Sequence, residues 1–111
     1  MKRDYKLYLT DIGESIRDIE NYTQGISEEQ FKNNKMMQDA VIRKLEIIGE
    51  ASKNIPSSLK EKNKQIPWFT ISHFRDLMIH SYFEVRLGKI WSTIKDVIPI
   101  IKQGLRNISL V

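Results

Sequence analysis

The spacing of apolar residues limits the possible folds of this chain more than any other feature. In each long segment, apolar residues recur at steps of three and four positions, which is the repeat of an amphipathic helix. No segment shows the strict alternation of apolar and polar residues that a half-buried strand needs. We therefore expect an all-α fold, an antiparallel four-helix bundle with short additional helices, formed as one domain over residues 1–111.

Four long helices can be located from these apolar stripes. The first is expected around residues 9–19, with Tyr5 before this stripe and Tyr22 or Thr23 after it. The others are expected from about residue 35 to residue 53, from residue 67 to residue 80, and from about residue 85 onward. Gly25 follows the first helix, and glycine commonly ends a helix. The residues that form the stripes are Leu9, Ile12, Ile16 and Ile19; Met37, Val41, Leu45, Ile48 and Ser52; Trp68, Ile71, Phe74 and Met78; and Leu87, Ile90, Trp91, Ile94, Ile101 and Leu105.

Two short helices are expected between the long ones. Ser27 and Gln30 have the spacing of a capping box, which predicts a short helix directly after Ser27. Ser57 and Ser58 follow a turn at Pro56 and suggest a second short, capped helix. We therefore interpret these two serines as capping residues and not as nucleophiles.

Two residues interrupt the long helical patterns. Gly49 lies inside the second long helix, where glycine costs about 1 kcal/mol relative to alanine. Its expected use is to let another helix approach closely. Pro99 lies inside the last helix and should kink or divide it, because proline lacks a backbone N–H and its ring collides with the preceding turn.

The composition excludes several classes of function. The chain has no cysteine, so disulfides, thiolate nucleophiles and cysteine-ligated zinc are excluded. The formal net charge of +4 would assist approach to a polyanion. Residues 1–10 lack the continuous apolar core of a signal peptide, and the longest uncharged apolar stretch is far below the roughly 20 residues of a membrane span. We expect a cytoplasmic protein with no membrane partner.

Polar side chains gather in residues 71–82, which is unusual for a helix of a bundle. This segment holds both histidines, His73 and His80, together with Arg75 and Tyr82. A guanidinium group offers a rigid fork of donors suited to a phosphate, and an imidazole can exchange a proton with a ribose hydroxyl or a leaving oxygen. Arg75 and His80 together therefore suit cleavage of an RNA phosphodiester.

The spacing of Arg75 and His80 leaves two ways of assembling such a site. On a regular helix these residues lie about 7.5 Å apart along the axis and about 140° apart around it, so they do not share a face. Either the helix ends near His80 so that its side chain turns back, or a site is assembled from two copies across a twofold axis. Tyr82 would lie under Arg75 if the helix continued.

A metal site is a competing interpretation of the same segment. His73, Asp76 and His80 share a helix face, and all three are residue types that bind metals. Three ligands from one helix leave the coordination shell incomplete, so we expect no metal and no other cofactor. For His73 we expect a structural role.

A charged stripe on the second long helix allows two interpretations. Asp39, Arg43, Glu46 and Glu50 lie opposite the apolar stripe of that helix. Glu46 and Glu50 could support catalysis, because paired carboxylates can serve as acid and base. Such a stripe is more often a solvated face with ion pairs such as Asp39 with Arg43, which is the interpretation we favour.

The pattern Arg75-x-x-x-x-His80-x-Tyr82 resembles the signature of HEPN-superfamily toxins of the HepT type. Residues 38–51 also resemble the middle-helix block of that family. Further similarity lies before the motif in residues 66–68 and after it in residues 82–85 and 90–91. The resemblance therefore extends over nearly the whole chain.

The resemblance implies a helical homodimer that acts as a metal-independent endoribonuclease within a type II toxin–antitoxin system. Arg75 and His80 carry over as catalytic residues, and Tyr82 matches the tyrosine to which a minimal nucleotidyltransferase antitoxin attaches AMP. Asp76 stands where the family commonly has asparagine, which places a negative charge beside Arg75. Asp76 is a further candidate supporting residue, and Ser81 replaces a frequent glycine.

A second function remains open from the sequence. The chain could be a non-catalytic helical subunit that binds substrate or nucleotide for a nucleotidyltransferase partner. The charge of Asp76 and the modest net charge are compatible with this alternative. Cleavage of RNA that depends on His80 would distinguish the two functions.

Overall fold

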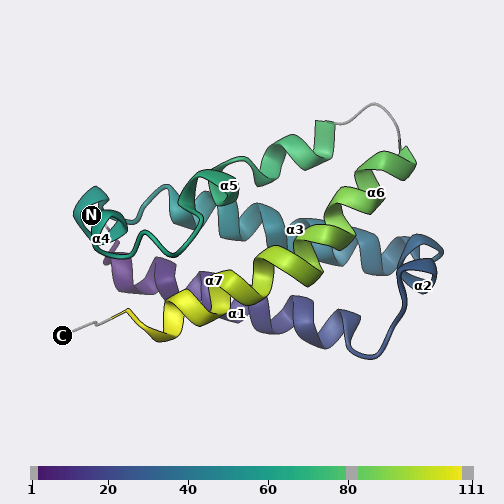
Figure 1. Ribbon diagram of the computed structural model, residues 1–111, viewed down its shortest axis with the longest axis horizontal. Helices are drawn as coiled ribbons and strands as arrows, with labels where there is room; N and C mark the ends of the chain where they lie inside the picture. The colour runs from purple at the N-terminus through teal and green to yellow at the C-terminus, as the bar shows by residue number, and fades with distance from the viewer. Residues whose placement is uncertain (1–2, 80–82, 109–111) are drawn as a thin grey trace.

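The predicted apolar stripes fold as helices in a computed structural model that describes residues 3–79 and 83–108 (Figure 1). No strand occurs in this part of the chain, which confirms the all-α prediction. In chain order, the elements are α1 (Tyr5–Thr23), α2 (Glu28–Lys32), α3 (Lys35–Ser52), α4 (Ser57–Lys62), α5 (Trp68–Ser72), the 3₁₀-helix η1 (Phe74–Ile79), α6 (Phe83–Ser92), the π-helical segment η2 (Thr93–Val97) and α7 (Ile98–Arg106).

Local hydrogen bonds set the first helix boundaries largely as the sequence predicts. Gly25, with a φ of 73°, turns the chain after α1 in a conformation that favours glycine. The capping box at α2 is confirmed, because the Gln30 amide donates to the Ser27 side chain at 3.1 Å and the Ser27 amide donates to Gln30 Oε1 at 2.8 Å. Asn34 caps α3 by accepting from the Met37 amide at 3.0 Å.

The predicted caps of α4 are wrong. Ser57 and Ser58 form its first turn, and neither side chain caps the helix. The helix begins instead after Pro56, whose carbonyl oxygen accepts the backbone amides of Leu59 and Lys60 at 3.0 and 3.1 Å. A proline fits here because its fixed φ suits a helix start and no donor is required from it.

The expected helix over residues 67–80 is also different in the structure. α5 ends at Ser72, and η1 continues the chain with a tighter winding. The carbonyl oxygen of Phe69 accepts from the Ser72 hydroxyl at 2.7 Å and lies 2.8 Å from His73 Nδ1, while the His73 amide donates to Thr70. These side chains occupy the acceptor that the next α-helical turn would use, so the α-helix stops.

Packing places α3 in the middle of the molecule. α1 lies along one side of α3, and α5 with η1 packs on another (Figure 1). Successive long segments run in opposite directions, and α7 lies against α1. The stripes supply the buried core, which is formed by Leu9, Ile12, Ile16, Ile19, Phe31, Val41, Leu45, Ile48, Ala51, Ile55, Ile66, Ile71, Phe74, Leu87, Ile90, Ile94, Ile98 and Ile101.

Pro99 divides the last helical run as expected. It lies in the first turn of α7, directly after the π-helical segment η2. The wider π turn accommodates the missing N–H and the bulk of the proline ring, so that the chain continues from α6 into α7. Among the described residues, no helix has both the length and the apolar character needed to cross a membrane.

Gly104 fixes the position of α7 over the segment that precedes α5. A Cβ atom on Gly104 would overlap Cγ1 of Ile66, whose side chain is buried. By contrast, a Cβ atom on Gly13 of α1 would meet nothing within 4 Å. The absence of a side chain is therefore a packing requirement at Gly104 and not at Gly13.

We expect Gly104→Ala to lower the free energy of unfolding by about 1–3 kcal/mol, because the added methyl group overpacks Ile66. Gly13→Ala is the matched control and should raise stability by about 0.5–1 kcal/mol, since alanine favours a helix interior. Urea unfolding followed by circular dichroism measures both changes. Equal effects of the two substitutions would contradict the packing role of Gly104.

Candidate functional site

A cavity between α3 and the α5–η1 segment brings together Arg75 and the charged stripe of α3. Its volume is about 300 Å³. The two carboxylate residues that were expected to support catalysis, Glu46 and Glu50, line this cavity with Arg75. The other polar lining residues are Arg43 from α3, Lys53 directly after α3, and Ser72 from α5.

α3 and the α5–η1 segment, which form the two walls of the cavity, approach each other closely at Gly49. A Cβ atom placed there would lie 3.5 Å from the carbonyl oxygen of Ile71 and 4.0 Å from Cβ of Phe74. The side chains of Ile71 and Phe74 are buried, which anchors α5 and η1 against α3. Arg75 follows Phe74 directly and is exposed, so the buried neighbour places the guanidinium group at the cavity.

Two cations of the cavity have no partner among the described residues. Neither Arg75 nor Arg43 forms an ion pair or hydrogen bond with any residue that the structure describes. Glu50 pairs with Lys53, whose Nζ lies 3.3 Å from the Glu50 carboxylate. Two guanidinium groups are therefore available to an anionic ligand at one side of α3.

The predicted ion pair between Asp39 and Arg43 is wrong. Asp39 pairs instead with Lys35, with an Nζ to carboxylate oxygen distance of 2.9 Å. Both candidate partners lie one helical turn from Asp39, so spacing alone did not decide between them. The result leaves Arg43 beside the cavity.

His73 has the structural role expected for it. Its ring stacks on Phe69 with a centroid distance of 4.2 Å, and its Nδ1 faces the end of α5. Asp76 is exposed in η1, and its backbone amide donates to the His73 carbonyl at 2.9 Å. Neither residue lines the cavity that contains Arg75.

The other two motif residues, His80 and Tyr82, lie outside the described residues, as does Ser81. The alternative metal site of His73, Asp76 and His80 therefore lacks a described third ligand. Within residues 3–79 and 83–108, no three histidine, aspartate or glutamate side chains come together as a metal site would require.

Sequence reasoning missed two residues of the cavity, Lys53 and Ser72. Lys53 continues the charged stripe of α3 at the next helical step after Glu50, so the stripe could have been extended to include it. Ser72 gives no comparable signal, because its position at the cavity depends on where α5 ends.

This helical domain brings into one cavity carboxylates and two arginines that have no partner among the described residues, and such groups can act on a phosphodiester. Comparison with known proteins gives a class that agrees with this chemistry. Residues 12–108 match the family described as "Ribonuclease HepT-like". The chain belongs to this HepT-like ribonuclease family, whose relatives carry ribonuclease names.

Three relatives show how far the similarity extends. A protein of Thermococcus cleftensis named "Probable ribonuclease HepT" is 50% identical over 92% of this chain and 93% of its own length. A "Putative RNase" of Methanocaldococcus jannaschii is 45% identical over 96% of this chain and 88% of its own.

The third relative, from the same organism as the second, is named "Gamma-glutamylcyclotransferase and putative RNase". It is 46% identical over 97% of this chain, which spans about half of that relative's length, 49%. No solved structure is a significant match to the chain.

We expect Arg75→Gln to change the free energy of unfolding by no more than about 0.5 kcal/mol, because the exposed guanidinium group has no partner among the described residues. The neighbouring substitution Phe74→Ala should cost about 3–5 kcal/mol, because it removes a buried ring. Urea unfolding of both variants provides the comparison. A large loss of stability in Arg75→Gln would mean that Arg75 supports the fold.

Proposed function

We propose that this chain is a metal-independent endoribonuclease and the toxin of a type II toxin–antitoxin system. The observation that carries the proposal is that Arg75 has no partner among the described residues and shares a cavity with Glu46 and Glu50. An arginine without an internal partner can give its donors to a phosphate, and the cavity supplies carboxylates beside it. The ribonuclease names of the relatives support RNA as the substrate.

In the proposed reaction, Arg75 binds the scissile phosphate and His80 moves protons. The ribose 2′-hydroxyl loses its proton to a base and its oxygen forms a bond to phosphorus. The bond from phosphorus to the 5′ oxygen of the next nucleotide breaks, and that oxygen takes up a proton. Glu46 or Glu50 supports these transfers by keeping the polar groups of the cavity oriented.

We further propose that the site is completed by a second copy of the chain. If the 3₁₀ winding of η1 reached His80, Arg75 and His80 would lie about 10 Å apart along the axis and about 120° apart around it. They would still not share a face. Phe69 and Phe83, on the helices before and after the motif, are 78% and 47% exposed, and an interface would cover such apolar side chains.

Purified protein should cleave single-stranded RNA in excess chelator, because the proposed reaction needs only side chains and the 2′-hydroxyl. His80→Ala should reduce the rate by at least about 100-fold, the usual scale of lost acid–base catalysis. His73→Ala is the matched control and should retain activity, since its ring caps α5. Gel analysis of labelled RNA measures the rates.

Two results of this assay would contradict the proposal. Loss of activity on chelation, restored by added metal, would favour the site of His73, Asp76 and His80. A protein that binds RNA or nucleotide and never cleaves would instead be the non-catalytic subunit of a nucleotidyltransferase complex.

We propose that a minimal nucleotidyltransferase antitoxin silences the protein by attaching AMP to Tyr82. In the presence of that partner and ATP, intact-mass measurement should show added AMP on the wild type and none on Tyr82→Phe. RNA cleavage should fall in the modified protein, because the added phosphate repels RNA and the base competes for its binding surface. Equal modification and silencing of Tyr82→Phe would place the acceptor elsewhere.

A further inference from the structure

A second concavity adjoins the cavity of Arg75 on the side of α1. Its volume is about 180 Å³, and Arg43 and Glu50 line both spaces. Tyr8 from α1 forms one wall of the second concavity, and Ile47 and Ala51 from α3 supply an apolar surface. The two spaces are therefore neighbours, with Arg43 and Glu50 between the side of Arg75 and the side of Tyr8.

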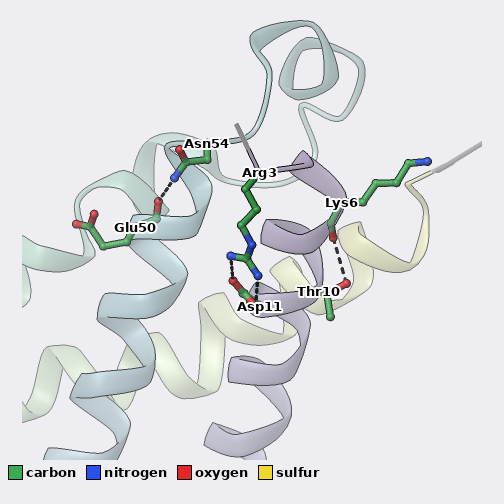
Figure 2. A network of polar contacts seen from close by, with 6 residues as sticks. All are labelled: Arg3, Lys6, Thr10, Asp11, Glu50 and Asn54. Carbon is green, nitrogen blue, oxygen red and sulfur yellow. Dashed lines mark hydrogen bonds and ion pairs between the residues drawn. The ribbon is translucent and has the colours of Figure 1, made fainter. Parts of the chain in front are cut away.

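The ring of Tyr8 is held in place by a charged neighbour. The Arg3 guanidinium carbon lies 4.7 Å from the centre of the ring. Arg3 is itself bound to Asp11 at 2.7 Å (Figure 2), and this hydrogen bond raises the pKa of Arg3. Asp11 also lines the concavity, and its pairing with Arg3 offsets a negative charge that would otherwise repel a phosphate.

Two polar residues that line the concavity, Asn54 and Glu50, have partners within the protein. The Asn54 side chain donates its amide to the carbonyl oxygen of Glu50 at 3.1 Å, as Figure 2 shows. The Glu50 carboxylate is paired with Lys53. Arg43 is thus the cation at the junction of the two spaces that lacks a carboxylate partner among the described residues.

We propose that the second concavity is a nucleotide subsite for the RNA residue adjacent to the scissile phosphate. Tyr8 packs against the base of that nucleotide, and Arg43 binds the next phosphate along the backbone, beyond the scissile phosphate at Arg75. This inference rests on the proposed RNA substrate. An aromatic ring beside a free arginine is the combination with which proteins bind single-stranded RNA, by stacking on the base and pairing with the backbone.

Binding can be measured separately from cleavage with a single-stranded 2′-O-methyl RNA of about ten nucleotides, which has no free 2′-hydroxyl to attack. Tyr8→Leu should weaken its binding roughly five- to 100-fold, and Tyr8→Phe should bind like the wild type because it keeps the ring. Tyr22→Leu is the matched control, since Tyr22 is an exposed tyrosine of α1 that does not line the concavity.

Arg43→Gln should also weaken RNA binding, and it should differ from Tyr8→Leu in how the affinity depends on salt concentration. The slope of the logarithm of affinity against the logarithm of salt concentration should become shallower by about 0.7, the value for one lost contact to a single-strand phosphate. The slope should stay unchanged in Tyr8→Leu. Arg106→Gln, which removes the same charge from the end of α7, should leave affinity and slope near those of the wild type.

The outcomes separate this inference from the proposed catalysis. If the wild type cleaves RNA and the Arg43 and Tyr8 variants bind like the wild type, the subsite is refuted while the ribonuclease function stands. If binding depends on Arg43 and Tyr8 in a protein that does not cleave RNA, the subsite stands and the catalytic proposal fails. Equal weakening in the control variants would also overturn the subsite, because it would show only a general effect of charge or stability.

Discussion

The packing of α5 and η1 against α3 at Gly49 is the constraint on which the rest of the site depends. The backbone of Ile71 approaches α3 so closely that a Cβ atom at position 49 would be in van der Waals contact with the Ile71 carbonyl oxygen. The buried side chains of Ile71 and Phe74 keep the α5–η1 segment packed against α3. Arg75 is exposed and directly follows Phe74, so this packing sets its position. The apolar core therefore determines which charged groups meet, although none of those groups belongs to the core.

The distribution of ion pairs around α3 explains why one face of this helix differs from the others. Lys44 is paired with Asp18 of α1 at 2.8 Å, and this hydrogen bond raises the pKa of Lys44. Arg43, its neighbour in sequence, has no such partner among the described residues. Lys44 therefore links α3 to α1, whereas the adjacent Arg43 faces the cavity.

The helical elements could be predicted from the sequence because their signals are local. The capping box of Ser27 and Gln30 needs only its own residues, and the apolar stripes need only a regular repeat. The end of α5 could not be predicted, because it depends on whether Ser72 and His73 or the next backbone turn takes the Phe69 carbonyl. Both arrangements satisfy the same acceptor, and tertiary packing decides between them.

The candidate site was predictable in its parts and not in its assembly. Glu46, Glu50 and Arg75 each drew attention by residue type, but their convergence requires the contact at Gly49, which lies between distant parts of the sequence. The partner of Asp39 was predicted wrongly because two cations lie at equal helical spacing from it. Residue type and period thus indicate candidates, and only the packed structure shows which of them share a cavity.

The π-helical segment η2 affects the direction in which the side chains of α7 point relative to those of α6. One residue of an α-helix corresponds to a rotation of about 100°, so a turn of different winding changes the direction in which every later side chain points. α6 packs on α2 and η1, whereas α7 packs on α1, and η2 lies between these two helices. The π-helical segment therefore joins two helices, divided before Pro99, that pack on different parts of the core.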